Sequence, residues 1–366
     1  MVDLYTAICV QANRSAISHR SEIKEKNLNR ALELIDYGFT WMDYQIYAPV
    51  KLIVFPEVFM QGWIKSAGKH DNIWHRVSKD IAIEIPGEET EMLAEKARKY
   101  NVYIAGGAHE RVPELGDDYP LNCVFIISPE GKVIYKHHKF CTYLTYVWFD
   151  DISPHDIWDK YIKAFDGKYG RKAGDIVSCF FPVVETDIGK LGYIICNEGF
   201  YSEHSRALGI QGCEVMLRSS GVLEPEGSPP QQSWEITNRA AAFYNMMYVV
   251  ACGPGDYLME SSPRHSTPGQ SMIIDFQGAF LQHVTYPGET VTGAVINIEQ
   301  LRKRRMDPKH NWIPQLRTEL YREIYKKSMY PINLYEKRLP ETQKERLYES
   351  PVQKLVKEGI FIPPAK

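Results

Sequence analysis

The chain has 366 residues, of which 44% are hydrophobic and 24% charged, and its net charge is −3. This composition is typical of a globular protein that buries a large core, and the lack of a basic excess argues against nucleic acid as a partner. No apolar run reaches the roughly 18 residues of a membrane helix, and the N-terminus lacks a basic leader, so we expect no membrane association. The seven cysteines are odd in number and lack C-x-x-C spacing, which favours a reducing compartment, the cytoplasm, over a disulfide framework.

Strand-like and helix-like segments alternate from residue 4 to about residue 299. Helical periodicity is found at residues 22–39, 88–100, 202–212 and 234–245. Several strand-like runs are apolar on both faces, as expected when helices cover one face of a sheet and a second sheet covers the other. The pattern predicts an α/β layered fold in one domain. The runs that predict strands are LYTAICVQA, KLIVF, VYIAGG, CVFIIS, LGYIIC, CEVML, MMYVVAC, SMIIDF and GAVINI.

Beyond residue 300 the chain becomes rich in charged residues and proline. One interpretation is a surface helix followed by a solvated tail, and the other is an arm that packs on a neighbouring subunit. We favour the arm, because Trp312, Leu316, Leu320 and Ile324 form an apolar stripe at helical spacing. The expected organisation is a main domain over residues 1–299 and a helical extension over residues 300–366.

Three chemically capable residues follow strand-like runs. Glu57 comes after KLIVF and a proline, Lys139 ends KVIYKHHK, and Cys196 ends LGYIIC. A thiol reacts as the thiolate, and it needs a nearby base or positive charge to ionise. If these strands pair in one sheet, the three side chains meet at its end. Spacing alone leaves a second interpretation open, since a free cysteine after an apolar run is commonly a core residue.

The order FPE, YKHHK and IICNEG resembles the Glu–Lys–Cys signature of the nitrilase superfamily of carbon–nitrogen hydrolases, and the similarity extends over most of residues 4–298. The segments CNEGFYSEHSRALGIQGCEVMLRSSG and QQSWEITNRAAAFYNMMYVVACG resemble its aliphatic amidase and formamidase branch. This resemblance implies a four-layer α-β-β-α sandwich.

The resemblance also implies a mechanism. Cys196 would attack an amide carbonyl carbon and form a thioester, and Glu57 would act as general base. Lys139 and the backbone N–H of Asn197 would stabilise the oxyanion. An amine or ammonia would leave, water would release the acid, and no metal or organic cofactor would be needed. The predicted function is hydrolysis of a linear carboxamide.

Other residues are candidates for supporting roles. Trp234 and Asn238 are candidate substrate contacts, with a core position as the alternative for Trp234. By resemblance, Glu110, Glu203 and Arg206 match positions that support the site without contacting substrate. The adjacent His137 and His138 should point to opposite faces of a strand, so they should not share a metal ion.

The sequence departs from the family pattern after Lys139. Related amidases carry a second glutamate at the position of Val147. Asp150, Asp151 and Asp156 follow but are out of register. Either one aspartate, Asp150 or Asp151, replaces the glutamate or the enzyme works without it. The alternative is that both are surface acids, so we leave both outside the catalytic set. The segment from Cys141 to Cys179 is longer than is usual in the family and rich in aromatic residues. It could line the pocket or build a subunit contact.

Two other functions stay open. The missing glutamate and the aromatic insertion permit an N-carbamoyl amide hydrolase acting on ureido acids, and the missing glutamate also permits a non-catalytic scaffold. The expected partners are a small-molecule amide and further copies of the chain, as a dimer or a larger homo-oligomer.

Overall fold

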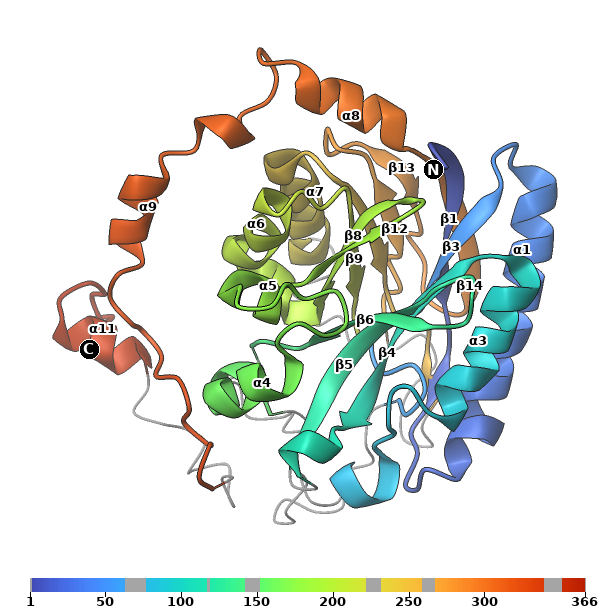
Figure 1. Ribbon diagram of the computed structural model, residues 1–366, viewed down its shortest axis with the longest axis horizontal. Coiled ribbons are helices and arrows are strands. Elements are labelled where there is room, and N and C mark those ends of the chain that lie inside the picture. Colours follow the sequence, from blue (N-terminus) through green and yellow to red (C-terminus); the bar gives the residue numbers. More distant parts are fainter. Residues whose placement is uncertain are drawn as a thin grey trace.

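The computed structural model describes residues 2–62, 77–116, 119–141, 152–221, 232–258, 267–338 and 351–365. In this part of the chain, two six-stranded sheets pack face to face between outer helices (Figure 1). The strand order is β14-β1-β3-β4-β5-β6 in the first sheet and β13-β12-β10-β9-β8-β7 in the second. The predicted four-layer α-β-β-α sandwich is therefore confirmed. No helix among the described residues has the length and apolar character needed to cross a membrane.

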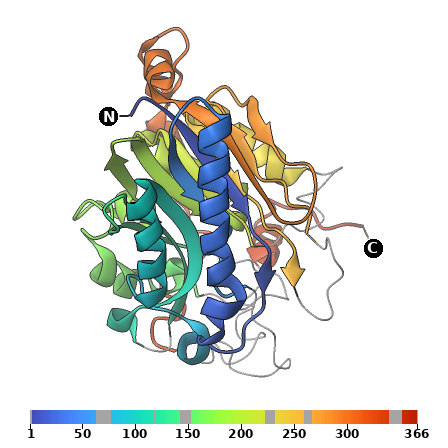
Figure 2. The ribbon, with the colours of Figure 1, turned by 90° about the vertical axis from the view of Figure 1, so that its right-hand side faces the viewer.

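The first sheet combines parallel and antiparallel pairs. Strands β1, β3 and β4 run parallel, while β5, β6 and β14 add antiparallel pairs. The helices α1 and α3 cover its outer face (Figure 2). Its strands are β1 Leu4–Gln11, β3 Val50–Val54, β4 Tyr103–Arg111, β5 Pro120–Ile127, β6 Val133–His138 and β14 Thr290–Asn297, and the helices are a π-helical turn Lys24–Leu28, α1 Asn29–Gln45, a second π-helical turn Val77–Ile81, α3 Glu88–Tyr100 and a 3-10 turn Pro113–Leu115.

The second sheet has a parallel centre of β8, β9 and β10, and the helices α6 and α7 cover its outer face. Its strands are β7 Val183–Thr186, β8 Gly189–Ile195, β9 Val215–Ser219, β10 Tyr248–Cys252, β12 Met272–Ile274 and β13 Phe280–His283, and the helices are α6 Ser202–Ile210 and α7 Ser233–Asn245. A short separate ladder joins β2 Arg14–Ser15 to β11 Tyr257–Leu258.

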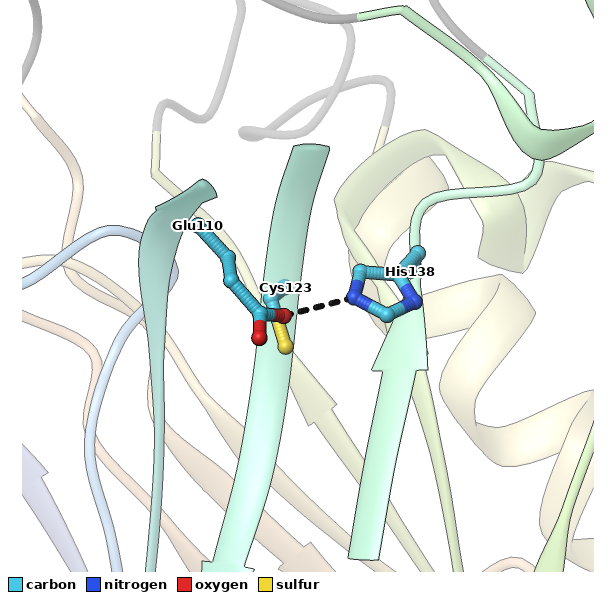
Figure 3. Close-up of side chains that lie close together, drawn as sticks. All are labelled: Glu110, Cys123 and His138. Carbon is cyan, nitrogen blue, oxygen red and sulfur yellow. Dashed lines mark hydrogen bonds and ion pairs between the residues drawn. The ribbon is translucent and has the colours of Figure 1, made fainter. Parts of the chain in front are cut away.

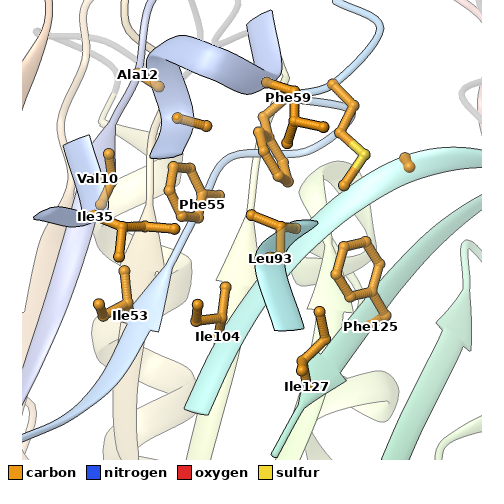
Figure 4. Packing of buried hydrophobic residues seen from close by; sticks show 14 of the residues in the cluster. Val10, Ala12, Ile35, Ile53, Phe55, Phe59, Leu93, Ile104, Phe125 and Ile127 are labelled. Atoms are coloured by element: carbon orange, nitrogen blue, oxygen red, sulfur yellow. The ribbon is translucent and has the colours of Figure 1, made fainter. Parts of the chain in front are cut away.

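The alternation of side chains along the strands divides the apolar residues between layers. In β3, Leu52 and Val54 point inward and pack between the sheets. Ile53 points outward, as does Phe55 just after the strand, and they pack with Ile35 of α1 and the residues of α3 (Figure 4). This explains why the strands read as continuous apolar runs, because both faces of each sheet are covered.

The described part of the insertion covers the end of β6. It contains a 3-10 turn Pro154–Ile157, α4 Trp158–Phe165 and α5 Ile176–Phe180. The rings of Tyr161 and Phe165 lie 5.5 and 4.6 Å from the ring of His138. Residues 142–151 of the insertion lie outside the described residues, so its expected role as a pocket wall or a subunit contact stays a prediction.

The C-terminal segment begins on the body and then leaves it. The helix α8 Ile298–Met306 buries Leu301, and Arg302 Nε lies 2.6 Å from Glu214 Oε1. The chain then forms an arm with a 3-10 turn Ile313–Gln315, α9 Thr318–Ile324 and α11 Pro351–Lys357, which runs outside the helices α4 to α7 (Figure 1). The expected stripe from residue 312 to 324 is not one helix. Pro314 lacks the N–H that a continuous helix needs, and α9 begins only at Thr318.

Candidate active site

Glu57 and Lys139 form a buried ion pair beyond the C-terminal ends of two strands of the first sheet. Glu57 follows β3 and Lys139 follows β6, and the Lys139 Nζ lies 2.7 Å from Glu57 Oε1. The Asn122 side-chain amide donates to the same oxygen over 2.7 Å, and the Gly221 backbone N–H donates to Oε2 over 2.6 Å. The Glu57 carboxylate is fully buried. The ion pair and the two hydrogen bonds offset the free-energy cost of burying its charge.

Cys196 reaches the same place from the second sheet. It directly follows β8 and opens a 3-10 turn, Cys196–Phe200. The structure thus brings the predicted triad of Glu57, Lys139 and Cys196 together, but not at the end of one sheet as expected. The nucleophile candidate comes from one sheet, and the base and the cation come from the other.

Burial and charge set the chemistry of the thiol. Burial raises the pKa of Cys196 above its ordinary value, and the nearby Glu57 carboxylate raises it further. The Lys139 ammonium opposes this rise, as do the Ser220 hydroxyl, whose oxygen lies 3.4 Å from the sulfur, and the Arg218 guanidinium. Since the pKa remains raised, the resting thiol is protonated at neutral pH. A base must remove its proton before it can attack, and Glu57 is the carboxylate whose charge acts on this thiol.

Asn197 and Glu198, which follow Cys196, hold this turn in place. The Asn197 side chain is buried, and its Nδ2 lies 3.4 Å from the Cys141 carbonyl. The Glu198 carboxylate accepts from the backbone N–H groups of Ile195 and Phe140, each over 2.6 Å. Since Phe140 follows Lys139, Glu198 ties the turn of the second sheet to the first. Glu198 was not among the candidate residues, and its neighbours in the sequence do not indicate this contact across the sheets.

The two adjacent histidines point to opposite faces of β6, as predicted. His137 bonds to Glu198 over 2.8 Å. His138 bonds to Tyr161 over 2.9 Å and to Glu110 over 2.7 Å. Burial lowers the pKa of His138 to about 4, and Glu110 only partly offsets this effect. Glu110 therefore bonds to the residue that directly precedes Lys139.

The ligand atoms of Glu110, Cys123 and His138 lie within 4.8 Å of one another, and all three residues are buried (Figure 3). However, both Glu110 oxygens are already engaged, one by His138 and one by the Lys136 ammonium. Burial alone would raise the pKa of Glu110, but Lys136 and His138 together lower it to about 2. We interpret this group as a buried ion-pair network rather than a metal centre, since a cation would compete with Lys136.

The remaining candidates have contacts of their own. Trp234 is 1% exposed, and its indole N–H donates to the Gln270 carbonyl over 3.0 Å, so it occupies the core position that was the alternative for it. Glu203 accepts a hydrogen bond from the Tyr325 hydroxyl of the arm. Arg206 also lies on α6. Burial lowers the pKa of Arg206, and the nearby Tyr321 of the arm partly offsets this effect. The contacts found for Glu203 and Arg206 are with the arm, because α6 lies in the outer layer.

Val147, at the position of the missing second glutamate, and Asp150 and Asp151 lie outside the described residues. Asp156, the next acid along the chain, is described. Its carboxylate accepts from the Ser153 backbone N–H over 3.3 Å and caps a 3-10 turn.

The sequence and the fold of this chain are similar to those of known proteins. The profile of the carbon–nitrogen hydrolase family matches residues 6–306. A formamidase of Helicobacter acinonychis (strain Sheeba) is 28% identical over 250 residues, which cover 68% of this chain and 63% of the formamidase. The chain thus matches less than two thirds of the length of this relative.

Solved structures share the fold. Nit3 of Saccharomyces cerevisiae, a member of branch 10 of the nitrilase superfamily, superimposes with a TM-score of 0.60 at 21% identity, over 84% of this chain and 97% of Nit3. A glutamate-to-glutamine mutant of an amidase from Nesterenkonia sp. AN1 gives a TM-score of 0.59 at 15% identity, over 87% of this chain and 96% of the amidase. That structure shows covalent addition of the acetamide moiety of fluoroacetamide at the active-site cysteine of the amidase.

Proposed function

The chain belongs to the carbon–nitrogen hydrolase family, and we propose that it is a cysteine amidohydrolase that cleaves a linear carboxamide to a carboxylic acid and ammonia. The observation that carries this proposal is the buried pair of Glu57 and Lys139, whose charged atoms are 2.7 Å apart. The pair acts electrostatically on the thiol of Cys196, which follows a strand of the other sheet. A carboxylate, an ammonium and a thiol in one place are the groups that acyl transfer to sulfur requires.

In the proposed first half-reaction, Glu57 takes the proton of the Cys196 thiol and the sulfur attacks the amide carbonyl carbon. The Lys139 ammonium and the Asn197 backbone N–H stabilise the negative oxygen of the tetrahedral intermediate. Glu57 then gives its proton to the leaving nitrogen, the C–N bond breaks, and ammonia departs from a thioester on Cys196.

In the second half-reaction, Glu57 takes a proton from water, and the resulting hydroxide attacks the thioester carbonyl. The C–S bond breaks, the carboxylic acid leaves, and the proton returns to the Cys196 sulfur. The formamidase relative supports an amide as the substrate class, and the adduct in the Nesterenkonia amidase supports a cysteine as the nucleophile. A reducing compartment such as the cytoplasm would keep this thiol reduced.

The test is ammonia release from a panel of simple amides, ureido acids and nitriles. We expect release from amides, and we expect Cys196→Ala to lower it by at least about 10³-fold, since the nucleophile is lost. Cys213→Ala is the matched control, because Cys213 is buried near Arg305 and Glu214, away from the triad; it should keep its rate within a few-fold.

Three results would contradict the proposal. Unchanged ammonia release by Cys196→Ala would exclude this nucleophile. Activity on ureido acids alone would indicate an N-carbamoyl amide hydrolase. No product and no covalent adduct on Cys196 with any compound would indicate a scaffold.

We also propose that the protein is a homo-oligomer and that the arm contacts a second copy of the chain. On α9, Leu320 and Ile324 are 61% and 58% exposed, and on α7 Ile236 and Phe243 are also exposed. Exposed apolar side chains on an arm and on the helical layer beside it are typical of a surface that is covered in an assembly.

A further inference from the structure

Arg218 is a buried cation bonded to the backbone of Cys196. It lies on the helix-facing side of β9 and is 1% exposed. Its Nε and Nη2 both donate to the Cys196 carbonyl oxygen, over 3.1 and 2.7 Å. Burial lowers the pKa of Arg218 to about 10, so it remains charged at neutral pH. The planar guanidinium can place two donors on one oxygen, which a lysine cannot do with the same geometry.

Three residues of the segment QQSWEITNRAAAFYNMMYVVACG hold this guanidinium. Trp234, Thr237 and Asn238 are spaced i, i+3, i+4, so they lie on one face of α7. Arg218 Nη1 donates to Thr237 Oγ1 over 2.8 Å and to Asn238 Oδ1 over 2.9 Å. The Trp234 ring lies 4.3 Å from the guanidinium carbon, a cation–π contact. The segment that resembled the amidase branch therefore surrounds an arginine.

The turn at Cys196 needs such a support. Cys196 has a φ of 48°, in the left-handed region that residues other than glycine adopt only at a cost in free energy. Gly199, in the same turn, leaves room for the arginine, because a Cβ there would lie 1.9 Å from the guanidinium carbon. Cys196, Gly199 and Arg218 thus fit together as one local arrangement.

We propose that Arg218 is a positioning residue for the reaction: by fixing the Cys196 carbonyl from the helical side, it directs the thiol at Glu57 and the Asn197 N–H at the substrate oxygen. Trp234, Thr237 and Asn238 act through Arg218. This inference rests on the proposed function, which supplies the reaction, but the placement of the thiol can be tested without any amide.

The kinetic test uses Arg218→Lys, which keeps the charge and loses the two-donor geometry. We expect kcat for amide hydrolysis to fall about 10²-fold, since a shift of about 1 Å at reacting groups has that effect. KM should stay within about threefold, because no substrate contact is removed. Arg239→Lys is the matched control, since the next residue of α7 bonds instead to Glu235 and to the Gly278 carbonyl.

The second test follows alkylation of Cys196 by iodoacetamide, read by mass spectrometry, across pH 7 to 11, a range that extends above the raised pKa of the thiol. In Arg218→Gln the cation near the sulfur is lost, so the midpoint of the rate profile should rise by about one pH unit. A purely structural role would lower the thermal midpoint of unfolding but leave the pH profile in place. Because iodoacetamide needs no enzyme turnover, this result supports the Arg218 inference even if the wild-type protein releases no ammonia.

The inference is overturned if Arg218→Lys keeps kcat within twofold of the wild type, if Arg239→Lys loses as much activity, or if Arg218→Gln alkylates with an unshifted profile. Should the Arg218 variants not fold, Thr237→Val removes one bond to the guanidinium and keeps the side-chain shape. It should lower kcat by about three- to tenfold with an unchanged KM, and an unchanged kcat would then overturn the inference.

Discussion

Replacing Lys139 by methionine tests whether the pair with Glu57 is the charged centre of the site. The Lys139 side chain is 6% exposed and the Glu57 side chain 0%, so the variant leaves a buried carboxylate without its cation. Breaking a buried pair in this way typically costs 3–5 kcal/mol. Asn122 and Gly221 still donate to the carboxylate, which places the expected loss in the free energy of unfolding near the lower end, about 3 kcal/mol.

The double variant Glu57→Gln/Lys139→Met separates stability from activity. It removes both charges, so no unpaired ion stays buried, and most of the lost stability should return. Ammonia release should not return, because both the base and the oxyanion cation are gone. We expect each single variant and the double variant to be slowed by at least about 10³-fold.

Urea unfolding at pH 7 measures this cycle. Lys303→Met is the matched control, since Lys303 and Glu299 are also 2.7 Å apart but 74% and 59% exposed; it should change stability by less than about 0.5 kcal/mol. The reasoning is refuted if Lys139→Met costs no more than Lys303→Met, or if the double variant loses the sum of the two single losses.

Two further predictions concern acid stability and assembly. The folded-state pKa of His138 is lowered to about 4 from its ordinary 6.5, so the unfolded chain binds the proton first as the pH drops. The free energy of unfolding should therefore fall by roughly 3 kcal/mol between pH 6.5 and pH 4. In urea titrations at several pH values, His138→Gln should flatten this fall, whereas His310→Gln on the surface should not. Equal stability of the wild type at pH 7 and pH 4 would contradict the argument. Leu320→Glu/Ile324→Glu should lower the mass measured by light scattering toward that of one chain, whereas Ile362→Glu, 92% exposed near the C-terminus, should not; an unchanged mass in the double variant would exclude the arm contact.

The layered fold could be predicted because its signal is local. Leu52 and Ile53 are neighbours in β3, point to opposite sides, and are both buried. A strand that is apolar on both faces must be covered on both faces. Each such run in the sequence therefore predicts a further layer on either side of its sheet. The break in the arm was also visible in principle, since Pro314 lies inside the stripe that we expected to be one helix.

The arrangement of the site was less accessible, because it depends on which strands pair. Nothing near Glu57 or Cys196 in the sequence indicates that β3 and β8 belong to different sheets. Likewise, the spacing of Trp234, Thr237 and Asn238 predicts one helix face but not what that face contacts. Arg218 lies within an apolar strand, and only the packing of α7 on β9 shows that it reaches the Cys196 carbonyl.

Because the proposed nucleophile and its proposed base come from opposite sheets, the packing between the sheets becomes part of the proposed chemistry. The core between them, which includes Leu52 and Val54 of one sheet and Leu217 of the other, sets the separation of the strands that end at Glu57 and Cys196. Directional bonds then refine that separation, since the Glu198 carboxylate accepts from N–H groups on both sides. Apolar packing alone does not fix a hydrogen-bonding geometry, whereas a buried carboxylate with donors on two sheets does. In the proposed mechanism, two independent supports therefore hold the turn at Cys196: Glu198, which bonds across the sheets, and Arg218, which bonds from the helix-facing side of β9.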